Sequence, residues 1–161
     1  MTSVDCITKN WQNIKNRIVT TNRDLNSIQV LPVTKSVGLK EIQILAELGF
    51  NSFGENRIDA LAEKYALLQH QNFKWHFIGN IQSRKIPDIV GCSHLIHSVS
   101  SDAILAKLNT YGLKVAKKID ILLQVNVAQE PQKGGFLVSE IQQKIKSYLN
   151  LSNIRIKGLM T

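Results

Sequence analysis

Long hydrophobic runs are missing from this sequence, which excludes a protein anchored by membrane-spanning helices. The longest uncharged apolar runs are of the kind found at residues 121–123, whereas a membrane span needs about 18 apolar residues. Residues 1–6 contain no basic region leading into an apolar stretch, so the sequence predicts no secretory signal. We therefore expect a cytoplasmic protein with no membrane partner.

Cysteine is scarce as well. Cys6 and Cys92 are the two cysteines of the chain, and their separation matches no metal-ligand spacing. The sequence therefore predicts free thiols and no metal site. Linkers, low-complexity segments and demonstrable repeats are also missing, while 43% of the residues are hydrophobic and 20% are charged. This composition predicts one folded domain over residues 1–161.

Acidic residues are outnumbered by basic ones. Twenty Lys and Arg residues against twelve Asp and Glu residues give a net charge of +8. Such a charge favours anionic ligands, from a single phosphate ester up to nucleic acid. The sequence contains neither a helix-turn-helix pattern nor the aromatic signature of an RNA-binding sheet, so we expect no nucleic-acid partner.

Short β-rich runs alternate along the chain with stretches of helical periodicity. An amphipathic helix over residues 4–18 comes first, and further helical stretches begin near residues 39, 58, 83, 104 and 138. The one from residue 83 to about 90 is the weakest, because Pro87 lies inside it. The expected strands are residues 29–33, 52–53, 74–78, 94–96, 120–127 and 154–159.

This alternation predicts an α/β fold with parallel strands and right-handed crossovers. No G-x-G-x-x-G turn follows Val33, which argues against a dinucleotide-binding fold and favours a (β/α)₈ barrel of the TIM type. Six of the eight strands of such a barrel are visible, and the chain stops at residues 160–161. We expect a single barrel domain without its C-terminal part, and we expect its open sheet edges to lower stability and to favour self-association.

In a parallel barrel, the active face is built from residues just beyond the C-terminal ends of the strands. In this sequence these are Lys35, residues 54–56, residues 79–83, Ser98, Asn126 and residues 160–161. Lys35 is the only cation at the end of the first expected strand, where it is either a solvated loop lysine or an amine for Schiff-base chemistry. The spacing alone favours the solvated lysine.

Three other polar residues have two interpretations each. His76 lies between Trp75 and Phe77, so it points to the opposite face of its strand from both aromatic rings. We expect a core histidine bonded to the backbone, with a ligand contact as the alternative. Asn56 and Asn126 are equally suited to bind a ligand or to cap the helix that follows.

Seven ordered motifs nevertheless resemble the pyridoxal phosphate homeostasis proteins. The motifs are VTK at 33–35, FGEN at 53–56, WHFIG at 75–79, QS at 82–83, IHSV at 96–99, LQVNV at 123–127 and KGLMT at 157–161. The resemblance implies a fold similar to the N-terminal barrel of alanine racemase, with pyridoxal 5′-phosphate (PLP) as the cofactor. It implies that Lys35 is the Schiff-base lysine, and that Asn56, His76 and Met160 are further cofactor-binding residues. The family continues beyond the KGLMT motif with segments that supply most of the phosphate contacts, so the chain is a truncated product or those segments are supplied elsewhere.

The implied function is a role in cellular PLP homeostasis without turnover, with PLP-dependent apoenzymes as candidate recipients of the cofactor and a monomer as the full-length form. The alternative is a PLP-dependent amino-acid racemase. Two-sided proton transfer needs a second base, usually a tyrosine opposite the lysine. Tyr65, Tyr111 and Tyr148 all fall on expected helices or helix ends. We therefore expect no catalytic residue and no enzyme.

Overall fold

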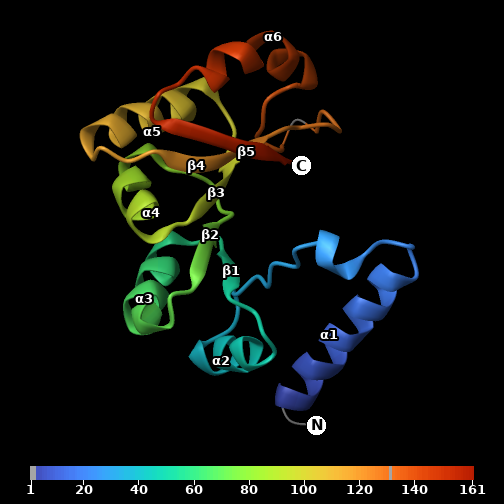
Figure 1. Cartoon of the computed structure of the whole chain (residues 1–161). Coiled ribbons are helices and arrows are strands. Elements are labelled where there is room, and N and C mark those ends of the chain that lie inside the picture. The colour runs from blue at the N-terminus through green and yellow to red at the C-terminus, as the bar shows by residue number, and fades with distance from the viewer. Residues whose placement is uncertain (1–2, 131) are drawn as a thin grey trace.

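A computed structural model describes residues 3–130 and 132–161, so that residues 1 and 2 of the stretch considered for a secretory signal lie outside it. Helices and strands alternate as the sequence predicts (Figure 1). The helices are α1 (Ser3–Val19), α2 (Leu39–Glu47), α3 (Ile58–Leu68), α4 (Ile86–Cys92), α5 (Asp102–Lys114) and α6 (Val138–Leu149). The strands are β1 (Ser52–Glu55), β2 (Lys74–Phe77), β3 (Leu95–Val99), β4 (Ile119–Gln124) and β5 (Ile154–Met160). Short 3₁₀ turns cover Leu25–Ser27, Gln69–Gln71 and Ser83–Lys85.

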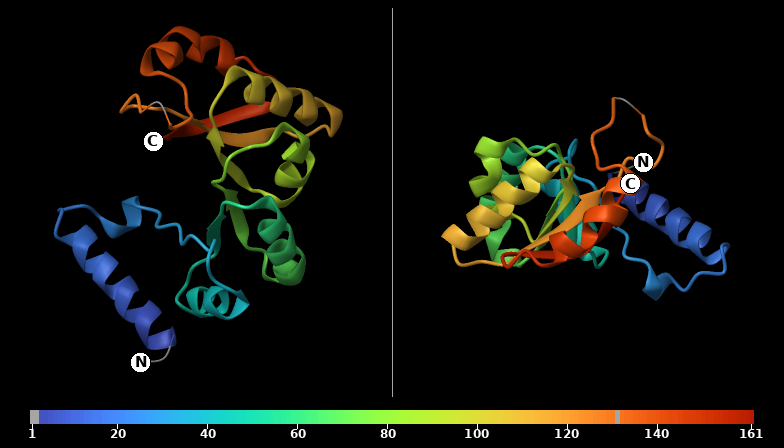
Figure 2. Two further views of the ribbon diagram at one scale, coloured as in Figure 1. Left: turned by 180° about the vertical axis from the view of Figure 1, so that it is seen from behind. Right: turned by 90° about the horizontal axis from the view of Figure 1, so that it is seen from above.

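All strand pairs within the sheet are parallel, and the strand order is β1-β2-β3-β4-β5. Helices α3, α4 and α5 lie on one side of the sheet, and α1 lies on the other (Figures 1 and 2). We call the side covered by α3, α4 and α5 the outer face and the opposite side the inner face. In the described part of the chain, no helix is both long enough and apolar enough to cross a membrane.

The core of the molecule lies between the outer face and its helices. In β1 to β4, the apolar residues that point to this side are at most 3% exposed. These residues are Phe53, Trp75, Phe77, Ile96, Ile119, Ile121 and Leu123. The helices contribute Leu61, Ile89, Leu105 and Leu108 to the same cluster. Burial of each such side chain contributes about 1.5–3 kcal/mol, so this layer supplies much of the driving force for folding.

The first expected strand, residues 29–33, is not a strand of this sheet. It makes a single parallel bridge, between Val33 and Gly54, in which the Gly54 N–H donates to the Pro32 carbonyl and the Thr34 N–H donates to the Gly54 carbonyl. Pro32 has no N–H and therefore cannot take part in a continuous ladder. The sheet within the described residues has five strands rather than the expected six.

The other differences from the expected elements are small. The strand expected over residues 120–127 ends at Gln124, so Asn126 belongs to a loop. Ser98 lies inside β3 instead of following it. Pro87 does not weaken its helix, because it occupies the first turn of α4, where its missing N–H has no helical partner to lose. One domain over residues 1–161 stays a prediction.

Candidate functional site

Three of the predicted site residues lie together where the first segments of the sheet end. Val33 is bridged to Gly54, and Gly54 is paired with His76 in the register of β1 and β2. Lys35 comes two residues after Val33, and Asn56 comes two residues after Gly54. Both residues are exposed, whereas Thr34 and Glu55, which precede them, are buried.

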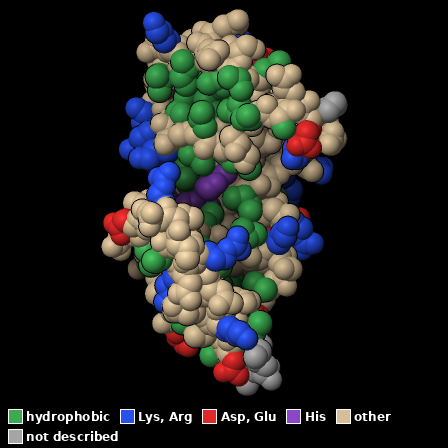
Figure 3. Space-filling model, turned by 90° about the vertical axis from the view of Figure 1, so that its right-hand side faces the viewer, with side chains coloured by type: hydrophobic (Ala, Val, Ile, Leu, Met, Phe, Trp, Pro, Cys, Tyr) green, Lys and Arg blue, Asp and Glu red, His purple; other side chains and the backbone are tan. Residues whose placement is uncertain are grey.

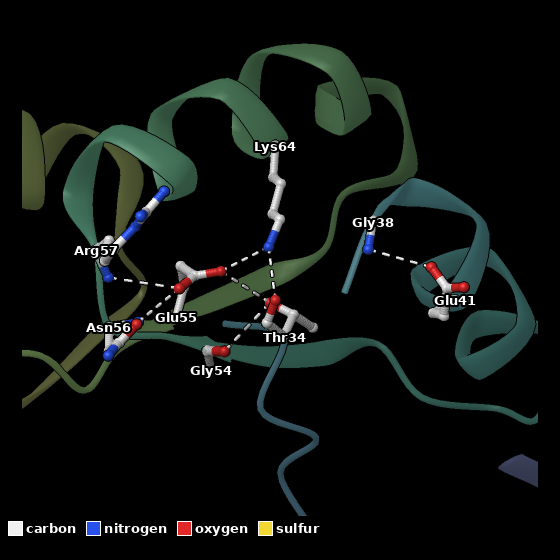
Figure 4. A network of polar contacts seen from close by, with 8 residues as sticks. All are labelled: Thr34, Gly38, Glu41, Gly54, Glu55, Asn56, Arg57 and Lys64. Carbon is white, nitrogen blue, oxygen red and sulfur yellow. Dashed lines mark hydrogen bonds and ion pairs between the residues drawn. The ribbon is translucent and has the colours of Figure 1, made fainter. Parts of the chain in front are cut away.

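Lys35 is exposed and occupies a turn whose backbone is fixed on both sides. Before it, Thr34 is fully buried. After it, the Val37 N–H donates to the Thr34 carbonyl at 3.2 Å, and the Gly38 N–H donates to the Glu41 carboxylate at the start of α2 (Figure 4). Among the described residues, none forms a hydrogen bond or ion pair with the Lys35 amine. The structure therefore presents a free amine on an anchored turn.

A buried ion pair, which the sequence did not predict, lies directly behind this turn. The Lys64 Nζ of α3 donates to a Glu55 carboxylate oxygen at 2.6 Å and to the Thr34 carbonyl at 2.7 Å (Figure 4). Glu55 is fully buried and Lys64 is 9% exposed. A signal was present in the sequence, because Glu55 takes the core-facing place two residues after Phe53, and Lys64 follows the core residue Leu61 by nearly one helical turn.

The Glu55 carboxylate is charged in this environment. Burial works to raise its pKa, but the hydrogen bond from Lys64, the N–H groups of Asn56 and Arg57, and the attraction of the Lys64 charge together hold the pKa below its ordinary value. The Asn56 N–H donates to Oε1 at 2.8 Å, and the Thr34 hydroxyl lies 3.3 Å from Oε2. Both carboxylate oxygens are thus occupied by donors.

His76 faces the inner side of the sheet, opposite Trp75 and Phe77, as predicted. The backbone partner that we expected for it is not what the structure shows, because its Nδ1 pairs with Nε2 of His97 on β3 at 2.9 Å. Burial, followed by the neighbouring His97, His94 and Lys74, lowers the pKa of His76 to about 4. Burial also lowers the pKa of His97. Both lowered pKa values favour neutral rings at pH 7, and in a neutral pair one nitrogen donates while the other accepts.

Histidine side chains are visible in a recess near the middle of one face of the molecule, with hydrophobic side chains and Lys or Arg side chains around them (Figure 3). Next to His76 the inner face is covered by apolar side chains, because a Cβ on Gly54 would meet Leu31, Val33 and Ile78 at 3.3–3.5 Å. Apolar side chains therefore pack over Gly54, beside the two histidines.

Asn56 lies at the junction of two loops. It is exposed, and its backbone carbonyl approaches Gly79 so closely that a Cβ there would lie 1.8 Å from the oxygen. Only glycine permits this contact between the loops that follow β1 and β2. A cavity of about 600 Å³ opens beside these loops, lined by Asn56, Gly79 and the basic residues Arg57, Arg84 and Lys85. Lys35, His76 and Met160 do not line it.

The remaining predicted positions lie further along the sheet. Met160 pairs with Gln124 at the end of β5, so strands β3 and β4 separate it from His76. The Asn126 side chain is bonded within its own loop, since its amide donates to the carbonyls of Glu130 and Lys133. The Ser98 hydroxyl donates to the Gly79 carbonyl. Asn126 and Ser98 thus have structural partners, and the described residues contain no cluster suited to a metal ion.

Comparisons with known proteins agree on one fold and one set of relatives. The family described as "Alanine racemase, N-terminal domain" matches residues 2–161. The pyridoxal phosphate homeostasis protein of Aquifex aeolicus is 31% identical over 139 residues, which cover 86% of this chain and 61% of the relative. The protein of the same name from Synechocystis is 34% identical over 136 residues, with coverage of 84% and 62%. The chain therefore spans about three-fifths of the length of these curated relatives.

Solved structures extend the comparison. PipY of Synechococcus elongatus is 26% identical and superimposes with a TM-score of 0.80 without PLP and 0.77 with PLP bound, over 91% of this chain and 68% of PipY. An alanine racemase of Clostridium difficile is 16% identical, with a TM-score of 0.74 over 96% of this chain and 39% of the racemase. At that identity the racemase shows the shared fold alone.

Proposed function

This chain belongs to the family of the alanine racemase N-terminal domain, and from this premise we propose that it binds PLP through the amine of Lys35 and serves PLP homeostasis. The observation that carries the proposal is the free Lys35 amine on an anchored turn at the end of the strands. The relatives named as PLP homeostasis proteins and the PLP-bound structure of PipY support the choice of cofactor.

The residues around Lys35 fit this cofactor. PLP supplies an aldehyde that forms a reversible covalent bond with an amine, and an aromatic ring that needs apolar surroundings. Leu31, Val33 and Ile78 provide an apolar surface over Gly54 on the inner face. Asn56 and His76 are the nearby polar residues that we assign to binding, and Met160 is assigned to the far side of the same face. The net charge of +8 suits a phosphate-bearing ligand.

Covalent labelling tests the proposal. The chain is incubated with PLP and reduced with borohydride, and the modified peptide is located by mass spectrometry. We expect one adduct, on Lys35, that is lost in Lys35→Ala and kept in Lys40→Ala, which removes an exposed lysine of α2. Circular dichroism confirms that both variants fold. An adduct that maps to another lysine in the wild-type chain contradicts the proposal.

We further propose that the protein is not a racemase, although the fold is shared with one. Tyr65, Tyr111 and Tyr148 lie on α3, α5 and α6, and the Tyr148 hydroxyl is bonded to Asp102. These described tyrosines offer no second base near Lys35. Incubation with L-alanine and PLP is expected to give no D-alanine by chiral chromatography. Interconversion that requires Lys35 contradicts this part of the proposal.

The finer assignments of partner and place follow from the same proposal. Cytoplasmic PLP-dependent apoenzymes are the recipients that a PLP carrier requires, because free PLP reacts with amines of any protein. The expected oligomeric state of the full-length family is a monomer. Size-exclusion chromatography at several concentrations measures that state directly.

A further inference from the structure

The turn that carries Lys35 is held from behind by charged side chains that do not themselves face the inner side of the sheet. We propose that the buried pair Glu55–Lys64 positions the Lys35 amine for its bond to PLP. This inference rests on the proposed function of Lys35. Glu55 and Lys64 are positioning residues, because Lys64 contacts the Thr34 carbonyl and Glu55 contacts the Thr34 hydroxyl, while neither contacts Lys35 itself.

The chain leaves the sheet at Thr34, directly before Lys35. The Thr34 N–H makes the last ladder hydrogen bond, to the Gly54 carbonyl at 2.8 Å, and the Lys35 turn follows at once. The Thr34 carbonyl then points away from the ladder and accepts from the Lys64 Nζ at 2.7 Å. Its other donor among the described residues is the Val37 N–H, at the longer distance of 3.2 Å. Lys64 therefore supplies the shorter of the two bonds to the peptide group that joins Thr34 to Lys35.

The Glu55 carboxylate connects the Lys35 turn to Asn56. Glu55 accepts the Lys64 ammonium and the Thr34 hydroxyl on one oxygen, and the backbone N–H of Asn56 on the other. One buried group thus fixes both the residue before Lys35 and the backbone of Asn56 (Figure 4). The spacing between these two proposed binding residues is set by contacts on the outer face, where water does not compete.

The free energy of a buried ion pair also favours a positioning role for Glu55 and Lys64. Removing two charges from water is costly, and an apolar pair of similar volume is often as stable as a buried ion pair. The neighbours of Lys64 on the buried side of α3 are Leu61 and Leu68, so an apolar residue would suit the site. A buried ion pair at this place adds little to the stability of the protein, but it makes directional hydrogen bonds to the turn that carries the Lys35 amine. We therefore assign the pair to positioning this turn and not to stabilising the fold.

The experiment removes both charges together, so that neither is left unpaired. The double variant Glu55→Gln/Lys64→Met is compared with the wild type and with Lys144→Met, which breaks the surface pair between Lys144 and Asp102. Amide hydrogen exchange is measured first, without PLP. In the double variant we expect residues 33–38 to exchange at least about tenfold faster, with β3 and β4 unchanged. Unchanged exchange in residues 33–38 overturns the proposal.

Ligand binding is the second readout. Pyridoxine 5′-phosphate has the ring and the phosphate of PLP but an alcohol in place of the aldehyde, so it forms no bond with Lys35. In the double variant we expect PLP affinity to fall at least about tenfold and pyridoxine 5′-phosphate affinity to change less than about twofold. An equal loss for both ligands indicates general damage and overturns the proposal.

Two controls keep the outcomes distinct. A wild-type chain that fails to bind PLP contradicts the proposed function, whereas the exchange measurement still decides whether the pair holds the Lys35 turn. If the double variant does not fold, Glu55→Gln/Lys64→Leu replaces it, since this pair of changes also removes both charges and the Lys64 bond to the Thr34 carbonyl. Faster exchange of residues 33–38 in this variant supports the proposal, and unchanged exchange overturns it.

Discussion

The two faces of the same sheet are built for different purposes. The outer face buries apolar residues such as Phe53, Trp75 and Leu123 beneath three helices, and it contains a single pair of buried charges. The inner face carries His76 and His97 and leaves other positions, such as Gln124, partly exposed. Because side chains alternate along a strand, one backbone provides stability on one side and an open, polar surface on the other. Through the Glu55–Lys64 pair, contacts on the outer face hold the turn that carries Lys35.

The largest expected effect comes from breaking that pair on one side only. Lys64→Met leaves the Glu55 carboxylate buried without its cation, and we expect the free energy of unfolding to fall by about 3–5 kcal/mol. Urea denaturation at pH 7 measures the change. In Glu55→Gln/Lys64→Met, where no charge remains, most of the loss should be recovered. A loss below about 1 kcal/mol in the single variant would show that the pair is not buried in solution.

The inner face should respond to pH where the outer face does not. The folded-state pKa of His76 is about 4, below the ordinary value of 6.5, so the unfolded chain takes up the proton first as the pH falls. The stability that depends on the neutral ring is complete above pH 6.5 and is lost between pH 6.5 and 4. We expect the free energy of unfolding to drop by about 2 kcal/mol between pH 7 and pH 5.

The variant His76→Gln tests whether His76 causes this loss of stability. Glu55 does not contribute to it, because its pKa is lowered in the folded state, so the stability that depends on its charge is lost only below about pH 4.5. Denaturation curves at pH 7 and 5 should therefore lie closer together for His76→Gln than for the wild type. The same spacing of the two curves in both proteins would refute the assignment to His76.

The smallest effect is expected at the surface. Lys85 and Asp59 form an ion pair at 3.0 Å in which Asp59 is largely exposed. Exposed pairs contribute about 0–1 kcal/mol, so Lys85→Met should change the free energy of unfolding by less than 1 kcal/mol. Adding salt should reduce even this difference. This variant is the matched reference for Lys64→Met, because both replace a paired lysine near the same loops.

The elements that sequence could predict are those that depend on local pattern. Helical periodicity located α1, α3 and α6, and strand–turn alternation placed Lys35 and Asn56 at the ends of successive segments. The expected strand over residues 29–33 was wrong. A strand needs a continuous ladder of hydrogen bonds to a neighbouring strand, and Pro32 has no N–H to donate to such a ladder. The face of His76 followed from period two, but its partner His97 lies on another strand, and only the register brings the two rings together.

The Glu55–Lys64 pair was missed for the same reason. Glu55 ends a strand and Lys64 lies on the helix that follows, so their contact depends on how α3 crosses over β1. Each residue alone is of a type that is usually exposed. Glu55 and Lys64 nevertheless occupy positions where the alternation of the strand and the periodicity of the helix predict apolar residues. A charged residue at such a position is a signal for a functional or positioning role.

The order of strands in the sheet has a consequence for how the chain assembles. Every strand pairs with the strand that comes next in the sequence, from β1 to β5. Each strand–helix unit can therefore dock on its predecessor as soon as it is synthesised, without waiting for a distant segment. The Lys35 turn is held by β1, α2 and α3, which all lie in the first half of the chain, so it should be ordered early. Pulsed amide exchange during refolding would refute this order if β4 and β5 became protected before β1 and β2.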